Sequence, residues 1–285
     1  MELNSSQINK IGKEIEKKIK GKTLFDEFSR GRYSTDASLY QIKPVGVVLP
    51  KDQNDVLSLM EYSQKNSLPL LARGGGSSQC GQTVGDCIVL DYSRHQNKIL
   101  ELNIEEKYVW VEPGIVLDHL NAYLKPHGLW YPVDVSTSSR ATIGGMTANN
   151  SCGSRSLYYG NMVHNVLAIE TILDDGSIHT FDSINKNYLA TTNDQDRLYK
   201  IINKFIDVKQ NVKNEIDENW PQTQRRVGGY NIDLIDPNGF NTSSILVGSE
   251  GTLSLFNKIK LKLSKIPTNK VLGVCYFENF HQAME

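Results

Sequence analysis

Three consecutive glycines, placed directly after a short apolar strand, restrict the fold of this chain more than any other feature of its sequence. Residues 68–72 predict a buried strand, and the loop Arg73-Gly74-Gly75-Gly76-Ser77-Ser78 begins where that strand ends. Apolar strands are also expected at 45–49 and 88–90. A helix capped by Asp52 is expected between the strands at 45–49 and 68–72. This order predicts a parallel βαβ unit whose glycine loop lies at the carboxyl end of a strand.

The glycine loop has the composition of a phosphate-binding loop. Glycines permit positive φ angles and present a row of backbone N–H groups with no Cβ in the way. The loop is neither a P-loop nor a Gly-x-Gly-x-x-Gly motif, because no Lys-Ser/Thr pair ends it and position 79 is Gln. Taken alone, it is equally compatible with a plain tight turn.

A second stretch of small and polar residues follows about 60 residues later. It comprises Ser136-Thr137-Ser138-Ser139, Thr142-Ile143-Gly144-Gly145-Met146 and Asn149-Asn150-Ser151-Cys152-Gly153. Two such loops with strands between them favour a long ligand held at two places, since Ser, Thr and Asn side chains suit hydrogen bonds to ribityl and ring heteroatoms. A bulged, close-packed sheet crossing is the alternative.

The rest of the chain predicts a largely antiparallel second part. Residues 108–111 alternate like a strand, and Asp174-Asp175-Gly176 joins two apolar strands in a hairpin. We expect a long helix at 198–212 and strands at 245–247, 259–261 and 271–277. The predicted fold is α+β in two subdomains. Its expected divisions are an N-terminal helical extension at 1–39, subdomains at about 40–104 and 105–265, and the start of a further domain at 266–285.

Composition excludes several classes of function. The chain has 31 Lys+Arg against 32 Asp+Glu, so a balanced charge gives no general attraction to nucleic acid or anionic lipid. Its four cysteines form no Cys-x-x-Cys pair, and its six histidines form no metal-binding motif. No secretory signal follows Met1. We therefore expect a cytoplasmic protein that binds a small molecule, with no metal site.

The motifs, taken in order, identify a family. They are Pro50, Arg73–Ser78, Val111–Gly114, Pro132-Val133-Asp134, Thr142–Met146, Asn149-Asn150, Gly229-Tyr230-Asn231 and Gly248–Leu253. As a set they resemble the flavin domain of the vanillyl-alcohol oxidase/p-cresol methylhydroxylase (PCMH) superfamily over residues 40–265. Within it, the chain is most similar to the branch of D-lactate dehydrogenase, glycolate oxidase and D-2-hydroxyglutarate dehydrogenase. The run 149–156 resembles bacterial FAD-linked oxidases fused to an iron–sulfur region.

The resemblance implies FAD bound noncovalently in an extended form between the two subdomains. It puts the pyrophosphate on the glycine loop, at Arg73, Gly74, Gly75, Gly76, Ser77 and Ser78. Further implied contacts are Gln82, Pro132, Ser136, Thr137, Gly144, Gly145, Asn150 and Gly153. Ser77 stands where tethering members of the superfamily have a histidine, so no histidyl bond is expected there. Cys152 is either an alternative tether or a small packing residue.

The implied reaction is the oxidation of a D-2-hydroxy acid to a 2-oxo acid, by hydride transfer from C2 to flavin N5. The family's substrate-binding cations and metal site belong mainly to a substrate-cap domain, whose start would be residues 266–285. Nearer the flavin, Arg225 and Arg226 are candidate cations, with surface arginines as the alternative. Tyr230 is a candidate for packing beside the isoalloxazine, with a core tyrosine as the alternative.

Partners and rival functions follow from the same resemblance. The electron acceptor would be an iron–sulfur protein or domain, which would allow peripheral attachment at the inner membrane. The apolar segment 271–277 would form an unpaired strand edge, so we expect either a disordered or packed-away tail after Lys265 or a homodimer that buries this segment. One rival is an FAD-binding module with no turnover of its own, and another is an NADPH-dependent reductase of an enolpyruvyl-UDP-sugar.

Overall fold

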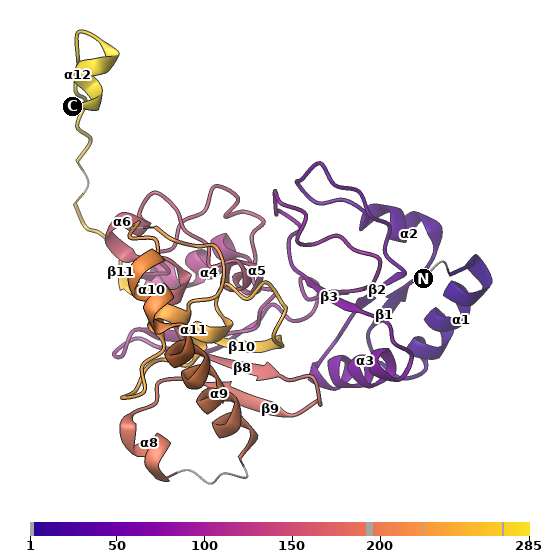
Figure 1. Cartoon of the computed structure of the whole chain (residues 1–285). Helices are drawn as coiled ribbons and strands as arrows, with labels where there is room; N and C mark the ends of the chain where they lie inside the picture. The colour runs from indigo at the N-terminus through magenta and orange to yellow at the C-terminus, as the bar shows by residue number, and fades with distance from the viewer. Residues whose placement is uncertain (1–2, 192–195, 224, 270) are drawn as a thin grey trace.

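The computed structural model describes residues 3–191, 196–223, 225–269 and 271–285. The chain forms two lobes around two main sheets (Figure 1). The first sheet has the strand order β1-β2-β4-β3, in which β2, β4 and β3 are parallel and β1 is antiparallel to β2. The elements of this first unit are α1 Ser5–Glu16, β1 Lys22–Leu24, α2 Glu27–Arg32, β2 Gly46–Leu49, α3 Gln53–Lys65, β3 Leu70–Arg73 and β4 Ile88–Asp91.

The predicted strand–helix–strand order around the glycine loop is confirmed. Asp52 caps α3, because its side chain accepts hydrogen bonds from the backbone N–H groups of Asn54 (3.0 Å) and Asp55 (3.1 Å). Leu59 on α3 and Ile15 on α1 are fully buried against the same face of the sheet as Ile88. This packing holds β3 in the sheet, so the glycine loop starts from a rigid strand end.

The second sheet is antiparallel throughout, with the order β5-β6-β10-β8-β9. The predicted hairpin between β8 and β9 is confirmed, and Gly176 in its turn has a φ of +80°. The strands of this second unit are β5 Ile99–Asn103, β6 Tyr108–Val111, β7 Leu129–Trp130, β8 Val166–Ile172, β9 Ile178–Phe181, β10 Leu255–Lys262 and β11 Ser264–Lys265, of which β7 and β11 form a separate small pair.

Helices cover the second sheet and connect its strands. The predicted long helix is α9, whose Ile202 and Ile206 pack against Ile235 and Ile245. The helices of the second unit are α4 Leu117–Leu124, η1 Lys125–His127, α5 Ile143–Ala148, α6 Ser156–Tyr159, α7 Met162–Asn165, α8 Lys186–Thr191, α9 Arg197–Asn211, α10 Lys213–Asn219, η2 Ile232–Leu234 and α11 Ser243–Leu246.

The strand expected at 245–247 is wrong, because α11 occupies Ser243–Leu246. Polar groups on either side decide the local structure. The side chain of Asn241 accepts a hydrogen bond from the N–H of Ser243 at 3.0 Å, which supports the first turn. The Asn231 amide donates to the carbonyls of Ser244 and Val247, which keeps those acceptors from a strand partner. Periodicity cannot separate a short buried strand from a short buried helix.

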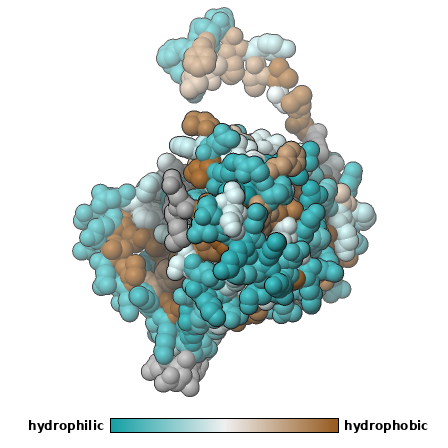
Figure 2. Space-filling view, turned by 90° about the vertical axis from the view of Figure 1, so that its right-hand side faces the viewer, coloured by the Kyte–Doolittle hydropathy of each residue, from teal (hydrophilic) through white to brown (hydrophobic). Residues whose placement is uncertain are grey.

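The strand expected at 271–277 is also wrong within the described residues. This segment is extended but unpaired, and Val271 and Leu272 are 96% and 88% exposed. It stands away from the body of the molecule, with apolar side chains open to solvent (Figure 2). A strand needs a partner for its backbone groups, and no described strand lies alongside. The short helix α12 Phe280–Met284 follows.

The two units share apolar core and polar contacts. Ile172 and Leu255, from the second sheet, belong to the core that contains Leu59 of α3. The amide of Asn257 on β10 donates to Gln53 Oε1 on α3 at 2.6 Å. These contacts place the end of β3 beside α5, where the candidate site lies. Of the helices in the described part of the chain, none is both long and apolar enough to span a membrane.

Candidate FAD-binding site

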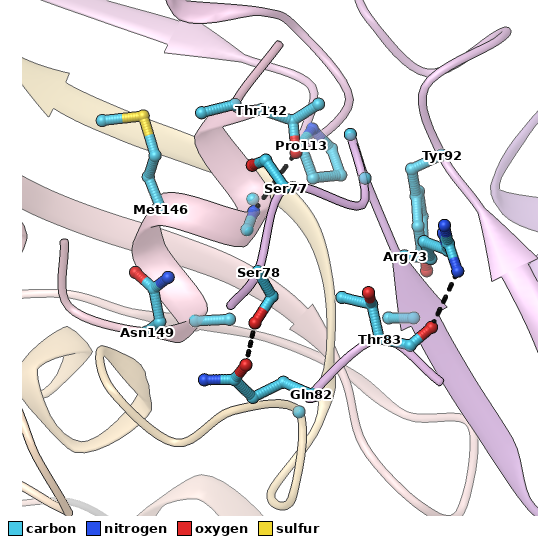
Figure 3. Close-up of a pocket in the computed structure, with 18 of the residues that line it drawn as sticks. Arg73, Ser77, Ser78, Gln82, Thr83, Tyr92, Pro113, Thr142, Met146 and Asn149 are labelled. Carbon is cyan, nitrogen blue, oxygen red and sulfur yellow. Dashed lines mark hydrogen bonds between the residues drawn. The ribbon is translucent and has the colours of Figure 1, made fainter. Parts of the chain in front are cut away.

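A pocket lies where the glycine loop (residues 74–82) meets α5 and the loop 248–254. Figure 3 shows Ser77 and Ser78 from the glycine loop facing Met146 and Asn149 from α5 and its carboxyl end. Glu250, Gly251 and Ser254 line the pocket from the third segment. The pocket therefore draws its walls from both units of the fold. The two small-residue stretches of the sequence meet here, as a long ligand held at two places requires.

Close backbone contact explains the glycines of the loop. A Cβ added to Gly74 would lie 2.0 Å from Thr142 Oγ1, and one added to Gly75 would lie 2.2 Å from the carbonyl oxygen of Arg140. Both distances are far inside van der Waals contact, so only glycine fits. Gly76 has a φ of +63°, in the left-handed region. These constraints press the loop against the segment 140–142 and turn its backbone toward the pocket.

The glycine loop also carries a row of free backbone donors. Among the described residues, no group accepts a hydrogen bond from the N–H of any residue from Gly74 to Gln79. Gly75 and Gln79 are exposed and the other four residues are half-buried, so these N–H groups are open to a ligand or to water. A run of unpaired N–H groups at a turn with a left-handed glycine forms a concave site for an anion. The loop therefore suits the phosphates of a nucleotide cofactor.

Arg73 supports the loop from behind. Its guanidinium donates to the backbone carbonyls of Tyr33 (3.2 Å), Thr35 (2.8 Å) and Thr83 (3.0 Å). Burial lowers the pKa of Arg73, and the nearby carboxylate of Asp91 acts in the opposite direction. These bonds occupy much of the guanidinium, so Arg73 ties the strand end to the segments 33–35 and 83.

The opposite wall is the start of α5. Thr142 caps this helix by accepting a hydrogen bond from the N–H of Gly145 at 3.4 Å. Gly144 is needed because a Cβ there would lie 2.6 Å from Cβ of Pro113. Pro113 itself lines the pocket. The start of α5 is thus wedged between the glycine loop on one side and the turn at 113–114 on the other.

Two buried hydroxyl groups at the pocket have no hydrogen-bond partner among the described residues. They belong to Tyr92 and Ser254, which both line the pocket. Burial raises the pKa of Tyr92, so its hydroxyl stays protonated at neutral pH. An unpaired buried hydroxyl costs free energy unless a ligand or water completes it. These groups, the free N–H row and the cradle of glycines fit a large polar cofactor such as FAD.

Most of the predicted cofactor residues line this pocket. They are Arg73, Gly74, Gly75, Gly76, Ser77, Ser78, Gln82, Thr137, Gly144 and Gly145. The other predicted residues, Pro132, Ser136, Asn150 and Gly153, do not line it. Asn150 lies behind the wall with a φ of +51°, and its Oδ1 accepts from the N–H of Val163 at 3.0 Å. Gly153 packs against Asp134, whose carbonyl oxygen would be 1.5 Å from an added Cβ.

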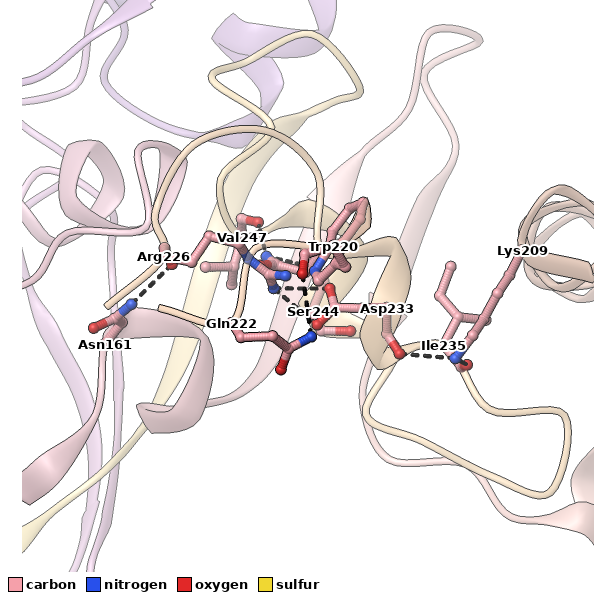
Figure 4. A network of polar contacts seen from close by, with 10 residues as sticks. Asn161, Lys209, Trp220, Gln222, Arg226, Asp233, Ile235, Ser244 and Val247 are labelled. Carbon is pink, nitrogen blue, oxygen red and sulfur yellow. Dashed lines mark hydrogen bonds and ion pairs between the residues drawn. The ribbon is translucent and has the colours of Figure 1, made fainter. Parts of the chain in front are cut away.

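The three residues nominated for the flavin's active face also lie outside the pocket lining. Arg225 donates to the carbonyl of Gly153 at 3.0 Å, and the hydroxyl of Tyr230 lies 2.7 Å from Thr252 Oγ1. Arg226 lies in a separate recess, where its Nη2 donates to both carboxylate oxygens of Asp233 at 2.8 Å (Figure 4).

The recess around Arg226 is a connected polar network. The Arg226 guanidinium lies 4.7 Å from the centre of the Trp220 ring, and the Arg226 carbonyl accepts from the Asn161 amide at 3.0 Å. His164, beside it, has a pKa lowered first by burial and then by the charge of Arg226. We call Asn161, Trp220, Arg226 and Asp233 the arginine network.

Several residues that line the pocket were not predicted from the sequence as cofactor contacts. Pro113, Thr142 and Glu250 belong to motifs that carried the family resemblance, so that signal was available. Tyr92 and Phe256 carried no such signal, because each is an ordinary residue just after or within a strand. Across the described residues, no three His, Cys, Asp or Glu side chains are grouped to hold a metal ion.

Comparisons with known proteins agree with this geometry. The profile of the FAD binding domain family matches residues 44–182. The chain is 34% identical to D-2-hydroxyglutarate dehydrogenase of Haemophilus influenzae over 264 residues, which covers 88% of this chain and 25% of the relative. With the enzyme of the same name from Pseudomonas putida it is 35% identical, over 93% of this chain and 27% of the relative. The chain thus spans about a quarter of the length of these relatives.

Solved structures share the fold. Alkyldihydroxyacetonephosphate synthase superposes with a TM-score of 0.65 and 19% identity, over 92% of this chain and 41% of that chain. 6-Hydroxy-D-nicotine oxidase from Arthrobacter nicotinovorans gives a TM-score of 0.59 and 15% identity, over 87% of this chain and 43% of that chain. The motifs and the pocket agree with the family match, so residues 44–182 of this chain form an FAD binding domain of this family, whose cofactor is FAD.

Proposed function

We propose that this chain is the FAD-binding part of a flavoenzyme that oxidises a D-2-hydroxy acid to the corresponding 2-oxo acid. The observation that carries the proposal is the free N–H row of residues 74–79, in a chain that is 32–35% identical to four bacterial D-2-hydroxyglutarate dehydrogenases. D-Lactate and glycolate are the other substrates of this class. NADPH-dependent reduction of an enolpyruvyl-UDP-sugar is the rival activity.

In this proposal the cofactor is held by the backbone rather than by charged side chains. The N–H groups of Gly74 to Ser78 bind the pyrophosphate, which needs no cation because the row of dipoles supplies the positive potential. Arg73 holds the loop in place through its three carbonyl contacts. Thr137, Gly144 and Gly145 contact the cofactor from the opposite wall, with Gln82 at the rim. Pro132, Ser136, Asn150 and Gly153 act at the flavin end or support that wall.

FAD supplies the chemistry by accepting a hydride from C2 of the substrate. The chain supplies placement, because a bound cofactor and substrate must meet in one orientation. Among the described residues that line the pocket, Glu250 is the only carboxylate and Arg73 the only cation. A base and a carboxylate-binding cation are therefore proposed to come from elsewhere, with Arg225 the freer of the nominated arginines. Arg226 already carries the Asp233 carboxylate. We propose that FAD binds noncovalently, because Ser77, which lines the pocket, stands where tethering members of the superfamily have a histidine.

A second candidate is an FAD-binding module without turnover of its own. It is favoured by the length of the match, since the chain covers about a quarter of its dehydrogenase relatives. In this case FAD is bound but no hydroxy acid reduces it unless a longer chain is supplied. The two candidates share the cofactor site and differ only in whether this chain completes a substrate site.

The deciding experiment begins with the visible spectrum of the purified chain and acid release of the cofactor. We expect flavin bands and free FAD. An anaerobic panel of D-lactate, glycolate and D-2-hydroxyglutarate should then bleach the flavin, with the L-enantiomers and NADPH as controls. Bleaching by NADPH alone would contradict the hydroxy-acid proposal. Binding without bleaching would favour the module, and a chain that takes up no FAD would contradict both.

The partner and boundary assignments stay part of the proposal. We propose an iron–sulfur protein or domain as the electron acceptor, a cytoplasmic location with peripheral attachment at the inner membrane through that acceptor, and a homodimer. The proposed divisions are the extension 1–39, subdomains at about 40–104 and 105–265, and the beginning of a substrate-cap domain at 266–285. Size-exclusion chromatography with light scattering tests the dimer directly.

A further inference from the structure

We propose that the cofactor enters and leaves through the glycine loop, and that a contact between Gln82 and Glu250 is the strap that closes it. This inference rests on the proposed function, because it takes FAD as the ligand of the pocket. It assigns a retention role to two side chains that come from sequence segments 168 residues apart. A pocket built between two units can open in two ways.

The first possible opening, a hinge between the two units, is opposed by their packing. Fully buried Ile172 of β8 sits in the same core as Leu59 of α3, and Asn257 bonds to Gln53 at 2.6 Å across the boundary. Gln64 near the end of α3 also donates to the carbonyl of Asp174 in the β8–β9 hairpin. Separating the units would expose this apolar surface and break these bonds.

The second possible opening is the glycine loop itself. In the FAD-free chain, the backbone N–H groups of residues 74–79 have no partner among the described residues, so displacing this loop breaks no hydrogen bond that they donate to protein groups. With FAD bound, the only hydrogen bonds that these N–H groups would lose are those to the leaving cofactor. The facing loop is better anchored, because Gly248 N–H donates to Thr147 O at 3.0 Å and Glu250 N–H donates to Ala148 O at 2.9 Å. Segments with few internal hydrogen bonds open at the lowest free-energy cost. The moving side is therefore the glycine loop.

One side-chain contact joins the free loop to the anchored one. Gln82 Nε2 donates to Glu250 Oε1 at 3.4 Å, and both residues line the pocket. Ser78 donates to Gln82 Oε1 (Figure 3), which leaves the amide nitrogen of Gln82 as the donor to Glu250. Glu250 is exposed and has a φ of +52°, an uncommon conformation for a residue other than glycine. The contact thus closes the rim that a bound cofactor must pass.

The test measures the release rate of FAD from the FAD-loaded chain, followed as the rise of flavin fluorescence after rapid dilution. Glu250→Ala removes the strap, whereas Glu250→Gln keeps an oxygen acceptor at the same place. We expect release to be about 3- to 10-fold faster in Glu250→Ala, as for the loss of one hydrogen bond, and closer to the parent rate in Glu250→Gln. A thermal unfolding midpoint for each variant shows that the fold is retained.

Two further variants separate the strap from its rivals. Because Gln82 is itself a proposed cofactor contact, Gln82→Ala is tested alone and together with Glu250→Ala. If the two side chains act through their mutual contact, adding Glu250→Ala to Gln82→Ala should speed FAD release by a smaller factor than Glu250→Ala does in the parent chain. Asn257→Ala weakens the boundary between the units and should leave the release rate unchanged. Faster release in Asn257→Ala with no change in Glu250→Ala would overturn the inference in favour of a hinge. A chain that binds no FAD would overturn the proposed function and this inference together.

Discussion

The glycine loop and the arginine network both contain many polar groups, but they differ in whether those groups have hydrogen-bond partners within the chain. In the arginine network, the guanidinium of Arg226 and the carboxylate of Asp233 are paired, with side chains 20% and 22% exposed. In the glycine loop, the N–H groups of residues 74–79 have no partner in the described chain. The charged pair of Arg226 and Asp233 is complete without a ligand. The row of N–H groups is completed by one.

This difference shows how to separate a binding site from a structural polar cluster. A paired charge holds its neighbours in place, and its removal is felt as lost stability. A row of unpaired donors held by close glycine contacts adds little to stability, and a substitution that displaces it lowers the affinity for FAD. The sequence drew attention to Arg225 and Arg226 because they are cations beside a family motif. The contacts of Arg226 place it with the structural polar groups.

The largest effect, on FAD affinity, is expected from adding a side chain at Gly75. In Gly75→Ala, the new Cβ would lie 2.2 Å from the carbonyl of Arg140, so the loop must move away from α5. Overpacking of this kind costs about 1–3 kcal/mol, and we expect FAD affinity to fall by about 5- to 150-fold. Isothermal titration with FAD measures it.

The matched control for Gly75→Ala is Gly31→Ala in α2, where an added Cβ meets nothing within 4 Å. FAD affinity should be unchanged in this control. Equal affinity in Gly75→Ala and the parent chain would mean that the glycine loop does not hold the cofactor.

A smaller effect, on stability rather than affinity, is expected in the arginine network. Asp233→Ala leaves the partly buried Arg226 without its carboxylate, and we expect the free energy of unfolding to fall by about 1.5–3 kcal/mol. Urea denaturation measures it. Asp217→Ala removes the exposed pair with Lys213 and should cost only about 0–1 kcal/mol. A loss of FAD affinity in Asp233→Ala without a loss of stability would reverse the roles assigned to the two regions.

The smallest effect is a pH dependence carried by His164. Its pKa in the folded chain lies below the ordinary value of 6.5, so the unfolded chain binds the proton more readily. The resulting stability is fully present above pH 6.5 and is lost as the pH falls toward the folded-state pKa. The unfolding midpoint should therefore drop between about pH 7.5 and 5.5, and less so in His164→Gln.

Two features isolate the His164 effect. Asp36 and Asp52 have pKa values lowered below 3.8, by hydrogen bonds that outweigh their burial, so their contribution is lost only at more acidic pH. His119→Gln, at an exposed position on α4, is the matched control. If His164→Gln and His119→Gln follow the same pH profile as the parent chain, His164 does not titrate with folding.

Local signals predicted much of the fold. The cap at Asp52, the apolar face of α3 and the turn at Gly176 each act within a few residues, and each has the structure expected. The wrong secondary-structure predictions lie where contacts between residues distant in the sequence determine the local structure. Residues 245–247 become part of a helix and its exit because Asn231, more than ten residues away, takes the carbonyls of Ser244 and Val247. The segment 271–277 has the composition of a strand but no described partner strand.

The candidate site was predictable in part for the same reason. Glycine runs are visible in the sequence, so the loop 74–78 and the pair Gly144-Gly145 were identified before the structure. The sequence cannot show that Gly74 touches Thr142, or that Tyr92 and Ser254 leave unpaired hydroxyls at the same pocket. Those facts depend on how the two units pack. The retention contact between Gln82 and Glu250 is of this kind as well.

Amide hydrogen exchange with and without FAD tests the central claim most directly, because the claim concerns individual backbone N–H groups. If the glycine loop binds the pyrophosphate, peptides covering residues 74–79 should exchange quickly in the FAD-free chain and become strongly protected when FAD is added. Peptides covering 226–233 should change little. Protection that appears at 226–233, while 74–79 exchanges equally fast with and without FAD, would contradict the account.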